Sequence, residues 1–113
     1  MTAQPRLTTR TNGIQEWRLA NGQLHRIDGP AYVHPNGTDE WWQHGKLHRV
    51  DGPAVTYTDG SEFWYQHGQR HRVGGPACTY SDGTRQWWIN GVRLEGFEAE
   101  VARRAWEQNR CPR

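Results

Sequence analysis

Short runs of aromatic and β-branched residues alternate with polar, glycine-containing turns along most of the chain. The runs are rich in Trp, Tyr, Thr and Val, a composition typical of β-strands. Asn-Gly and Asp-Gly supply the positive φ angles of tight hairpin turns. Two sets of such turn dipeptides recur, at Asn36-Gly37, Asp59-Gly60 and Asp82-Gly83, and at Asn21-Gly22, His44-Gly45, His67-Gly68 and Asn90-Gly91. The pattern therefore predicts successive β-hairpins.

The hairpins are predicted to repeat at a fixed stride. Nearly the same ten letters begin at Gly22, Gly45 and Gly68 as GQLHRIDGPA, GKLHRVDGPA and GQRHRVGGPA, 23 residues apart. Tandem repetition of one short unit is the signature of a stacked architecture. We expect a mainly β fold, an open meander of 23-residue β-hairpins. The first copy has one additional residue between its turns, which predicts a bulge or a frayed first strand.

The chain is expected to end in a helix. Phe97, Val101, Ala105 and Trp106 recur at helical spacing, which predicts an amphipathic capping helix on the last hairpin. The 113 residues allow one domain. We expect an N-terminal extension over residues 1–12, hairpin repeats over 13–96, a helix over 97–109 and a tail over 110–113.

Two aromatic ladders are expected on opposite faces of the sheet, because adjacent strand residues point to opposite sides. The aligned aromatics are Trp41, Trp64 and Trp87 in one ladder and Trp42, Tyr65 and Trp88 in the other. An exposed aromatic ladder would mark a binding surface. Alternatively, the sheet coils around one ladder while arginine and glutamine stems cover the other. The sequence leaves both interpretations open.

Within the ten-letter motif, Asp28 and Asp51 align with Gly74. Asp and Gly both tolerate turn conformations, so this position and the following Gly-Pro are predicted to form a bend before the next strand. His44 and His67 precede a turn glycine, where His is tolerated at positive φ. Backbone geometry therefore accounts for these residues.

The His-Arg pairs in the motif allow two interpretations. The imidazoles could bond backbone groups of a neighbouring turn while the arginine stems pack over Trp. Alternatively, the two side chains form a ladder of donors for an anionic ligand. The residues concerned are His25, His48 and His71 with Arg26, Arg49 and Arg72.

Composition excludes several functions. A formal charge of +2 is too small to indicate nucleic-acid binding by itself. We expect no catalytic residues, no metal and no cofactor, since zinc-ligand spacings, nucleophile motifs and phosphate loops are absent from the sequence. No apolar run reaches the length of a membrane span. Without a secretory signal or a cysteine framework, a cytoplasmic location is expected.

The stretch GSEFWYQHGQRHRVGGPACTYSDGTRQWWINGVRLEG resembles the MORN repeats, which also have a 23-residue hairpin unit with an aromatic and a DG turn. The resemblance covers roughly residues 13–96. The HR-x-D/G-GPA signature is more similar to a divergent variant of short bacterial and bacteriophage proteins. The resemblance implies an elongated hairpin sheet used for protein–protein contact, sometimes for oligomerisation, with no enzymatic activity.

The leading hypothesis is a non-enzymatic protein that binds a partner protein, as a small phage or bacterial inhibitor or adaptor. Trp and Arg are common interface hot spots, so the two aromatic ladders and the three motif arginines are the expected contacts. One alternative is a nucleotide or single-stranded nucleic-acid binder that stacks bases on the aromatics. Another is a homo-oligomeric structural component.

Overall fold

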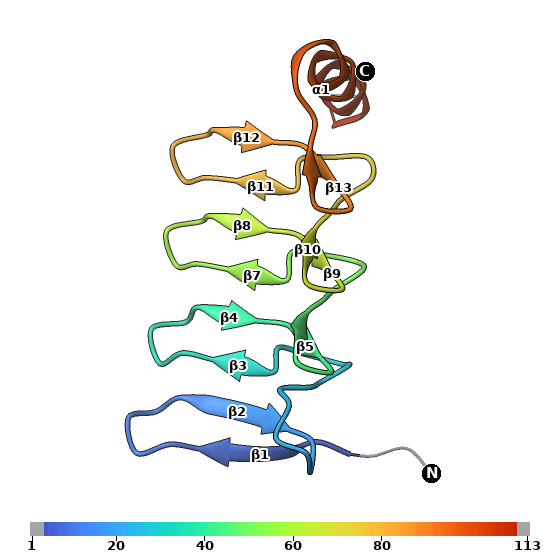
Figure 1. The fold of residues 1–113 in the computed structure, drawn as a ribbon. Coiled ribbons are helices and arrows are strands. Elements are labelled where there is room, and N and C mark those ends of the chain that lie inside the picture. The colour runs from blue at the N-terminus through green and yellow to red at the C-terminus, as the bar shows by residue number, and fades with distance from the viewer. Residues whose placement is uncertain (1–3, 111–113) are drawn as a thin grey trace.

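The wider hairpins of the chain form one antiparallel sheet in the computed structural model, which describes residues 4–110 (Figure 1). The order of the strands in the sheet follows their order along the chain, so the sheet is an open meander. The predicted fold class is confirmed. The strands are β1 (Arg6–Thr9), β2 (Gln15–Arg18), β3 (Tyr32–Val33), β4 (Asp39–Glu40), β7 (Val55–Thr56), β8 (Glu62–Phe63), β11 (Cys78–Thr79) and β12 (Arg85–Gln86).

Hairpins whose two strands are joined by two residues, which we call narrow, form a second column beside the wide hairpins of the sheet (Figure 1). Backbone bonds join successive narrow hairpins, as between Arg49 N and Tyr65 O (3.0 Å) and between Gly68 N and Leu47 O (2.8 Å). The stack is therefore tied along both columns and reaches 46 Å in its longest dimension. The narrow strands are β5 (Trp42–Gln43) with β6 (Lys46–Leu47), β9 (Tyr65–Gln66) with β10 (Gln69–Arg70), and β13 (Trp88–Ile89) with β14 (Val92–Arg93).

The turn residues that the sequence singled out close the hairpins as predicted. Asp59 Oδ1 accepts the backbone N–H of Ser61 at 2.8 Å, and Gly60 adopts a φ of 93°. This side-chain acceptor replaces a backbone acceptor within the turn, which is why Asn or Asp precedes the glycine. His44, His67 and Asn90 take positive φ angles of 49°, 53° and 48°, so the prediction from turn geometry is confirmed.

A single residue forms the corner between the second strand of each wide hairpin and the first strand of the narrow hairpin that follows it. Between β4 and β5 this residue is Trp41, whose N–H donates to Ala54 O (2.6 Å) and whose carbonyl accepts from His48 N (2.9 Å). Trp64 makes the same pair of bonds with Ala77 and His71. Because the corner residue is bonded to two neighbours, the angle between the two columns is the same in successive copies.

The N-terminal end differs from the sequence prediction. The described part of the predicted extension, residues 4–12, belongs to the first hairpin instead, because β1 lies within it and pairs over four residues with β2. The first strand is therefore not frayed. Residues 1–3 lie outside the described part of the chain. The additional residue of the first copy lies in its narrow turn. Arg18 pairs with Leu24 there, six residues further along, whereas Trp42 of the next copy pairs with Leu47, five residues further along.

The capping helix exists as predicted, but only Ala105 and Trp106 of the predicted apolar face lie toward the last hairpin. Helix α1 (Gly96–Arg110) follows the last narrow hairpin and lies at the end of the stack (Figure 1). Phe97 and Val101 were expected to pack inward, yet they are 82% and 50% exposed. Trp106 makes the inward contact, and Ala102 is partly buried. Small alanines let the helix approach the last hairpin closely, and the larger Phe97 and Val101 are left outside.

Among residues 4–110, no helix has the length and apolar character that crossing a bilayer would require.

Candidate functional site

The Trp41 ladder is covered from within the molecule. The guanidinium of Arg49 stacks on the Trp41 ring, with Cζ 3.9 Å from the ring centroid, and its Nη1 donates to Pro53 O at 3.2 Å. Arg72 stacks in the same way on Trp64 at 3.8 Å. These contacts confirm the interpretation in which the motif arginines pack over the tryptophans. Trp41 and Trp64 are consequently part of the framework rather than a free aromatic surface.

A glycine lies on the other side of each stacked guanidinium. A Cβ atom built on Gly52 would lie only 2.6 Å from Cζ of Arg49, and Gly29 and Gly75 stand in the same relation to Arg26 and Arg72. None of these three glycines adopts a positive φ. A side chain at these positions would take the space that the stacked arginine occupies, so the arginine would have to move.

The bend predicted before the next strand is present in all three copies, but the role of Asp within it differs from the prediction. Arg26 and Arg49 donate through Nε to Asp28 and Asp51, both at 3.1 Å. Neither Asp adopts a positive φ, whereas Gly74 does, at 89°. Asp and Gly therefore do not share a turn conformation here. The first two copies have an ion pair at this position and the third has none.

Two tryptophans complete the ladder at its ends. Trp17 is the first member, since Arg26 stacks on it at 4.0 Å. The 23-residue alignment missed it because of the additional residue, and a shift of 24 would have found it. At the other end the motif arginine is replaced by Glu95. Trp106 from the helix contacts Trp87 instead, edge to face, with centroids 6.0 Å apart.

The motif histidines bond the backbone of the next copy. Nδ1 of His25, His48 and His71 accepts the N–H of His44, His67 and Asn90 respectively, at 2.9–3.0 Å. The rings of His25 and His44 also lie 4.4 Å apart. This confirms the structural interpretation of the histidines. The His-Arg pairs are thus engaged inside the stack, and they do not form a ladder of free donors for an anion.

These bonds predict that acid destabilises the protein. An accepting Nδ1 requires a neutral ring with its proton on Nε2. Burial lowers the pKa of His25 and of His48 from the ordinary 6.5, and the neighbouring His44 and His67 lower them further. The unfolded chain therefore binds more protons. This contribution to stability is fully present above pH 6.5 and is lost as pH falls through the lower folded pKa values.

Urea unfolding at about pH 7.5 and about pH 5.5 measures this loss at His25 and His48, and we expect a lower free energy of unfolding at the lower pH. The worth of a typical hydrogen bond, about 1 kcal/mol, sets the scale of the loss. A matched variant carries His25→Asn and His48→Asn, because the asparagine Oδ1 can accept the same N–H without titrating. Its stability should change much less over this range. An equal loss in the variant would show that other groups cause the pH dependence.

The second aromatic ladder lines a hollow at the corner between the two columns, which we call the corner groove. It has a volume of about 250 Å³ and is partly open to solvent. Trp42 and Tyr65 of the predicted ladder line it, and Trp88 lies next along the stack, with Arg70 5.0 Å from its ring centroid. The residues lining the groove are Glu40, Trp42, Leu47, Val55, Tyr57, Phe63, Tyr65 and Arg70.

Hydrogen bonds fix the rings of this ladder. Trp42 Nε1 donates to Glu40 at 2.8 Å, and Arg70 Nε donates to the Tyr65 hydroxyl at 3.3 Å. Tyr57 packs edge to face on Phe63 with centroids 5.7 Å apart. The sequence analysis did not assign Tyr57, Phe63 or Arg70 to the surface. Phe63 could have been assigned from the sequence, because it lies two residues before the ladder position Tyr65 and residues two apart in a strand share a face.

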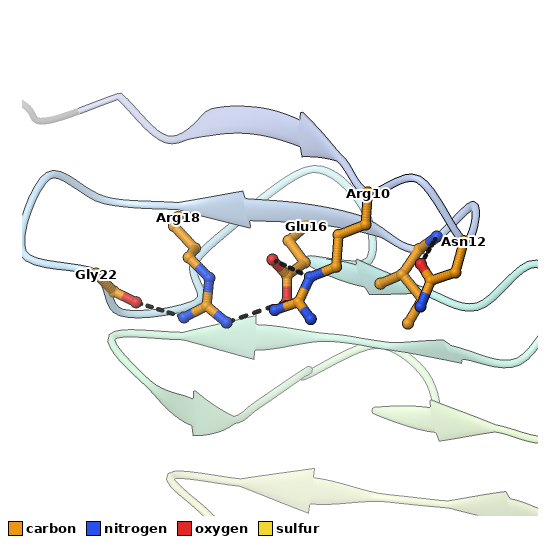
Figure 2. A network of polar contacts seen from close by, with 6 residues as sticks. Arg10, Asn12, Glu16, Arg18 and Gly22 are labelled. Atoms are coloured by element: carbon orange, nitrogen blue, oxygen red, sulfur yellow. Dashed lines mark hydrogen bonds and ion pairs between the residues drawn. The ribbon is translucent and has the colours of Figure 1, made fainter.

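The face that carries the groove continues toward β1 with two carboxylates in line with it. Glu16, Tyr32 and Glu40 are direct cross-strand partners, so their side chains lie on one face of the sheet. Glu16 is buried between Arg10 (2.9 Å) and Arg18 (3.1 Å), as Figure 2 shows. The hydrogen bond from Arg18 is the main reason that the pKa of Glu16 lies below its usual value, despite its burial. The charges at this end are therefore neutralised internally.

Among residues 4–110 no three His, Cys, Asp or Glu side chains lie together as a ligand set for a metal ion. Comparison with models of known protein families, with curated proteins and with solved structures finds no match to this chain.

Proposed function

We propose that the chain is a non-enzymatic binding protein that holds a segment of a partner protein in the corner groove. The observation that carries the proposal is a partly open hollow of about 250 Å³ lined by the aromatic rings of Trp42, Tyr57, Phe63 and Tyr65. Aromatic side chains supply large contact areas, and Trp, Tyr and Arg are the residues most enriched at interface hot spots. A contiguous aromatic surface that stays partly exposed, as here, usually marks an interaction site.

Rigidity of the groove supports the same function. The indole of Trp42 and the phenol of Tyr65 are each held by a hydrogen bond within the protein. A partner would therefore meet rings that already have their bound orientation, and little side-chain entropy would be lost on binding. The two ionic groups of the groove, Glu40 and Arg70, take part in these bonds. Apolar side chains are consequently the main feature that the groove would recognise in a partner.

The other aromatic ladder provides the contrast. Trp41 and Trp64 are covered by arginines, and Trp87 is covered by Trp106. The proposal therefore concerns Trp42, Tyr65 and Trp88, and assigns Trp41, Trp64 and Trp87 with the motif arginines to the framework. The resemblance to MORN repeats, which implies protein–protein contact, supports the same proposal. A cytoplasmic location and a role as a small inhibitor or adaptor belong to it as well.

Site-specific photocrosslinking tests the proposal. Tyr57 is 44% exposed and lines the groove, so p-benzoylphenylalanine at this position preserves an aromatic ring there. We expect irradiation in the native cell to give a discrete crosslinked protein. An additional Trp42→Ala substitution should weaken the crosslink about tenfold, the effect of losing a typical hot-spot residue.

Val50 provides the matched control, because it is 67% exposed and does not line the groove. The photocrosslinker at Val50 should give no discrete product. Equal crosslinking from both positions, or a product insensitive to Trp42→Ala, would contradict the proposal. A product of twice the chain's mass would instead support self-association, and a product sensitive to nuclease would support nucleic-acid binding.

A further inference from the structure

The third motif arginine lacks a partner that the first two have. Arg26 and Arg49 each bond a carboxylate through Nε, but the corresponding position after Arg72 is Gly74. Arg72 keeps its other contacts, namely the Trp64 ring at 3.8 Å and Pro76 O at 3.1 Å. Within residues 4–110 its Nε has no hydrogen-bond acceptor. One side of this guanidinium is therefore available to an anion.

An apolar hollow of about 190 Å³ opens beside this arginine. It lies where helix α1 takes the place of a further repeat, between the third motif loop and the inward face of the helix. The first two motif loops have another hairpin in that direction, so this environment occurs at the third loop alone among the described copies. The residues lining the hollow are Arg72, Val73, Gly74, Gly75, Trp87, Ile89, Leu94, Ala102, Ala105 and Trp106.

Arg72 is the one charged side chain of the lining, and its charge is incompletely compensated. Burial lowers the pKa of Arg72 from its usual value, and the charge of Glu62, which makes no hydrogen bond to Arg72, opposes this lowering. A partly buried cation such as Arg72 is stabilised chiefly by an anion that also accepts its hydrogen bonds. The first two copies provide that anion as an Asp side chain. The third copy presents the same guanidinium to a hollow instead.

The apolar part of the lining sets the chemistry of the rest of the ligand. Trp87 and Trp106 supply two indole rings, and Ile89, Leu94 and two alanines supply aliphatic surface. A cavity of about 150 Å³ lined by apolar side chains can accommodate benzene. The hollow is therefore large enough for one aromatic ring with a short substituent. A carboxylate on that substituent could reach the arginine only if the ring and the carboxylate are close together in the ligand.

We infer that this hollow, the helix-end pocket, binds a small aromatic carboxylate. The carboxylate accepts from Arg72 at the position that Asp28 and Asp51 occupy in the other copies, and the ring packs between the last hairpin and the helix. Such a ligand would join Arg72 to Trp106 and so stabilise the contact of the helix with the stack. The pocket lies outside the corner groove, and its function does not depend on the partner proposed there.

Isothermal titration and the indole N–H signals in NMR spectra test this inference. The probes are benzoate, phenylacetate and indole-3-acetate, each compared with its neutral amide, and acetate as an anion without a ring. We expect at least one aromatic carboxylate to bind and to shift the indole signals of Trp87 and Trp106. Its amide should bind at least about tenfold more weakly, because the charge-assisted hydrogen bond is lost. Acetate should leave both signals unchanged.

Two variants locate the site. Arg72→Gln should abolish binding, whereas Arg49→Gln, which removes an equally stacked arginine with its own carboxylate partner, should leave it unchanged. If Arg72→Gln does not fold, Ala102→Leu fills the hollow from the helix without altering the arginine, and it should also abolish binding. Absence of binding by all three carboxylates, equal binding of the amides, or equal losses in the Arg72 and Arg49 variants would each overturn the inference.

Discussion

Replacing Gly52 by alanine is expected to destabilise the protein by about 3 kcal/mol, although Gly52 does not adopt the positive φ that disfavours alanine. The new Cβ would lie 2.6 Å from Cζ of Arg49, so the guanidinium has to leave its place. It would then lose its stacking on Trp41 and its hydrogen bond to Pro53 O. Urea unfolding followed by tryptophan fluorescence measures the loss.

The double variant Arg49→Ala/Gly52→Ala distinguishes this steric cause from a backbone effect. Arg49→Ala alone removes the stacking and is destabilising, but it also removes the atoms that the new methyl group would meet. We therefore expect Gly52→Ala to cause little further loss in the Arg49→Ala background. The coupling energy should be about 2 kcal/mol. Strictly additive effects would show that glycine is required at this position for its own conformational freedom.

The role of these glycines illustrates what could be predicted from the sequence. The turn dipeptides act locally, since Asn36, Asp59 and Asp82 each bond an N–H two residues further along. The hairpins and their order therefore followed directly. The requirement for Gly52 depends on a side chain that folds back over it. An Arg does stand three residues before each of these glycines, at Arg26, Arg49 and Arg72, and this spacing was the available signal.

Prediction of the candidate site was also partial. Strand alternation correctly separated Trp41 from Trp42, because neighbouring residues on an extended chain point to opposite faces. It did not show which ladder would be covered, since the covering guanidiniums come from the motif loops. The predicted face of the helix was only half right for a related reason, because Ala105 and Trp106 lie toward the last hairpin and Phe97 and Val101 do not. Hydrophobicity favoured Phe97 and Val101, whereas close approach to the last hairpin favoured the smaller alanines beside Trp106.

Trp106→Ala is expected to detach the helix from the stack and to destabilise the protein by about 3 kcal/mol, within the range found for removal of packed aromatic side chains. The Trp106 ring contacts Trp87 edge to face, and the guanidinium of Arg85 lies 4.7 Å from its centroid. Trp87 is buried in this arrangement and has no arginine of its own to cover it. Without Trp106, the last member of the aromatic ladder would become exposed to solvent.

The expected signature is a lower urea midpoint together with a loss of helical circular dichroism, because an isolated helix of 15 residues is marginally stable in water. Phe97→Ala is the matched control, since it removes a large aromatic side chain from the same helix at a position that is 82% exposed. It should change the free energy of unfolding by less than about 0.5 kcal/mol. If Phe97→Ala proved the more damaging of the two, Trp87 would be covered by the opposite face of the helix, and the helix-end pocket would lose its second indole ring.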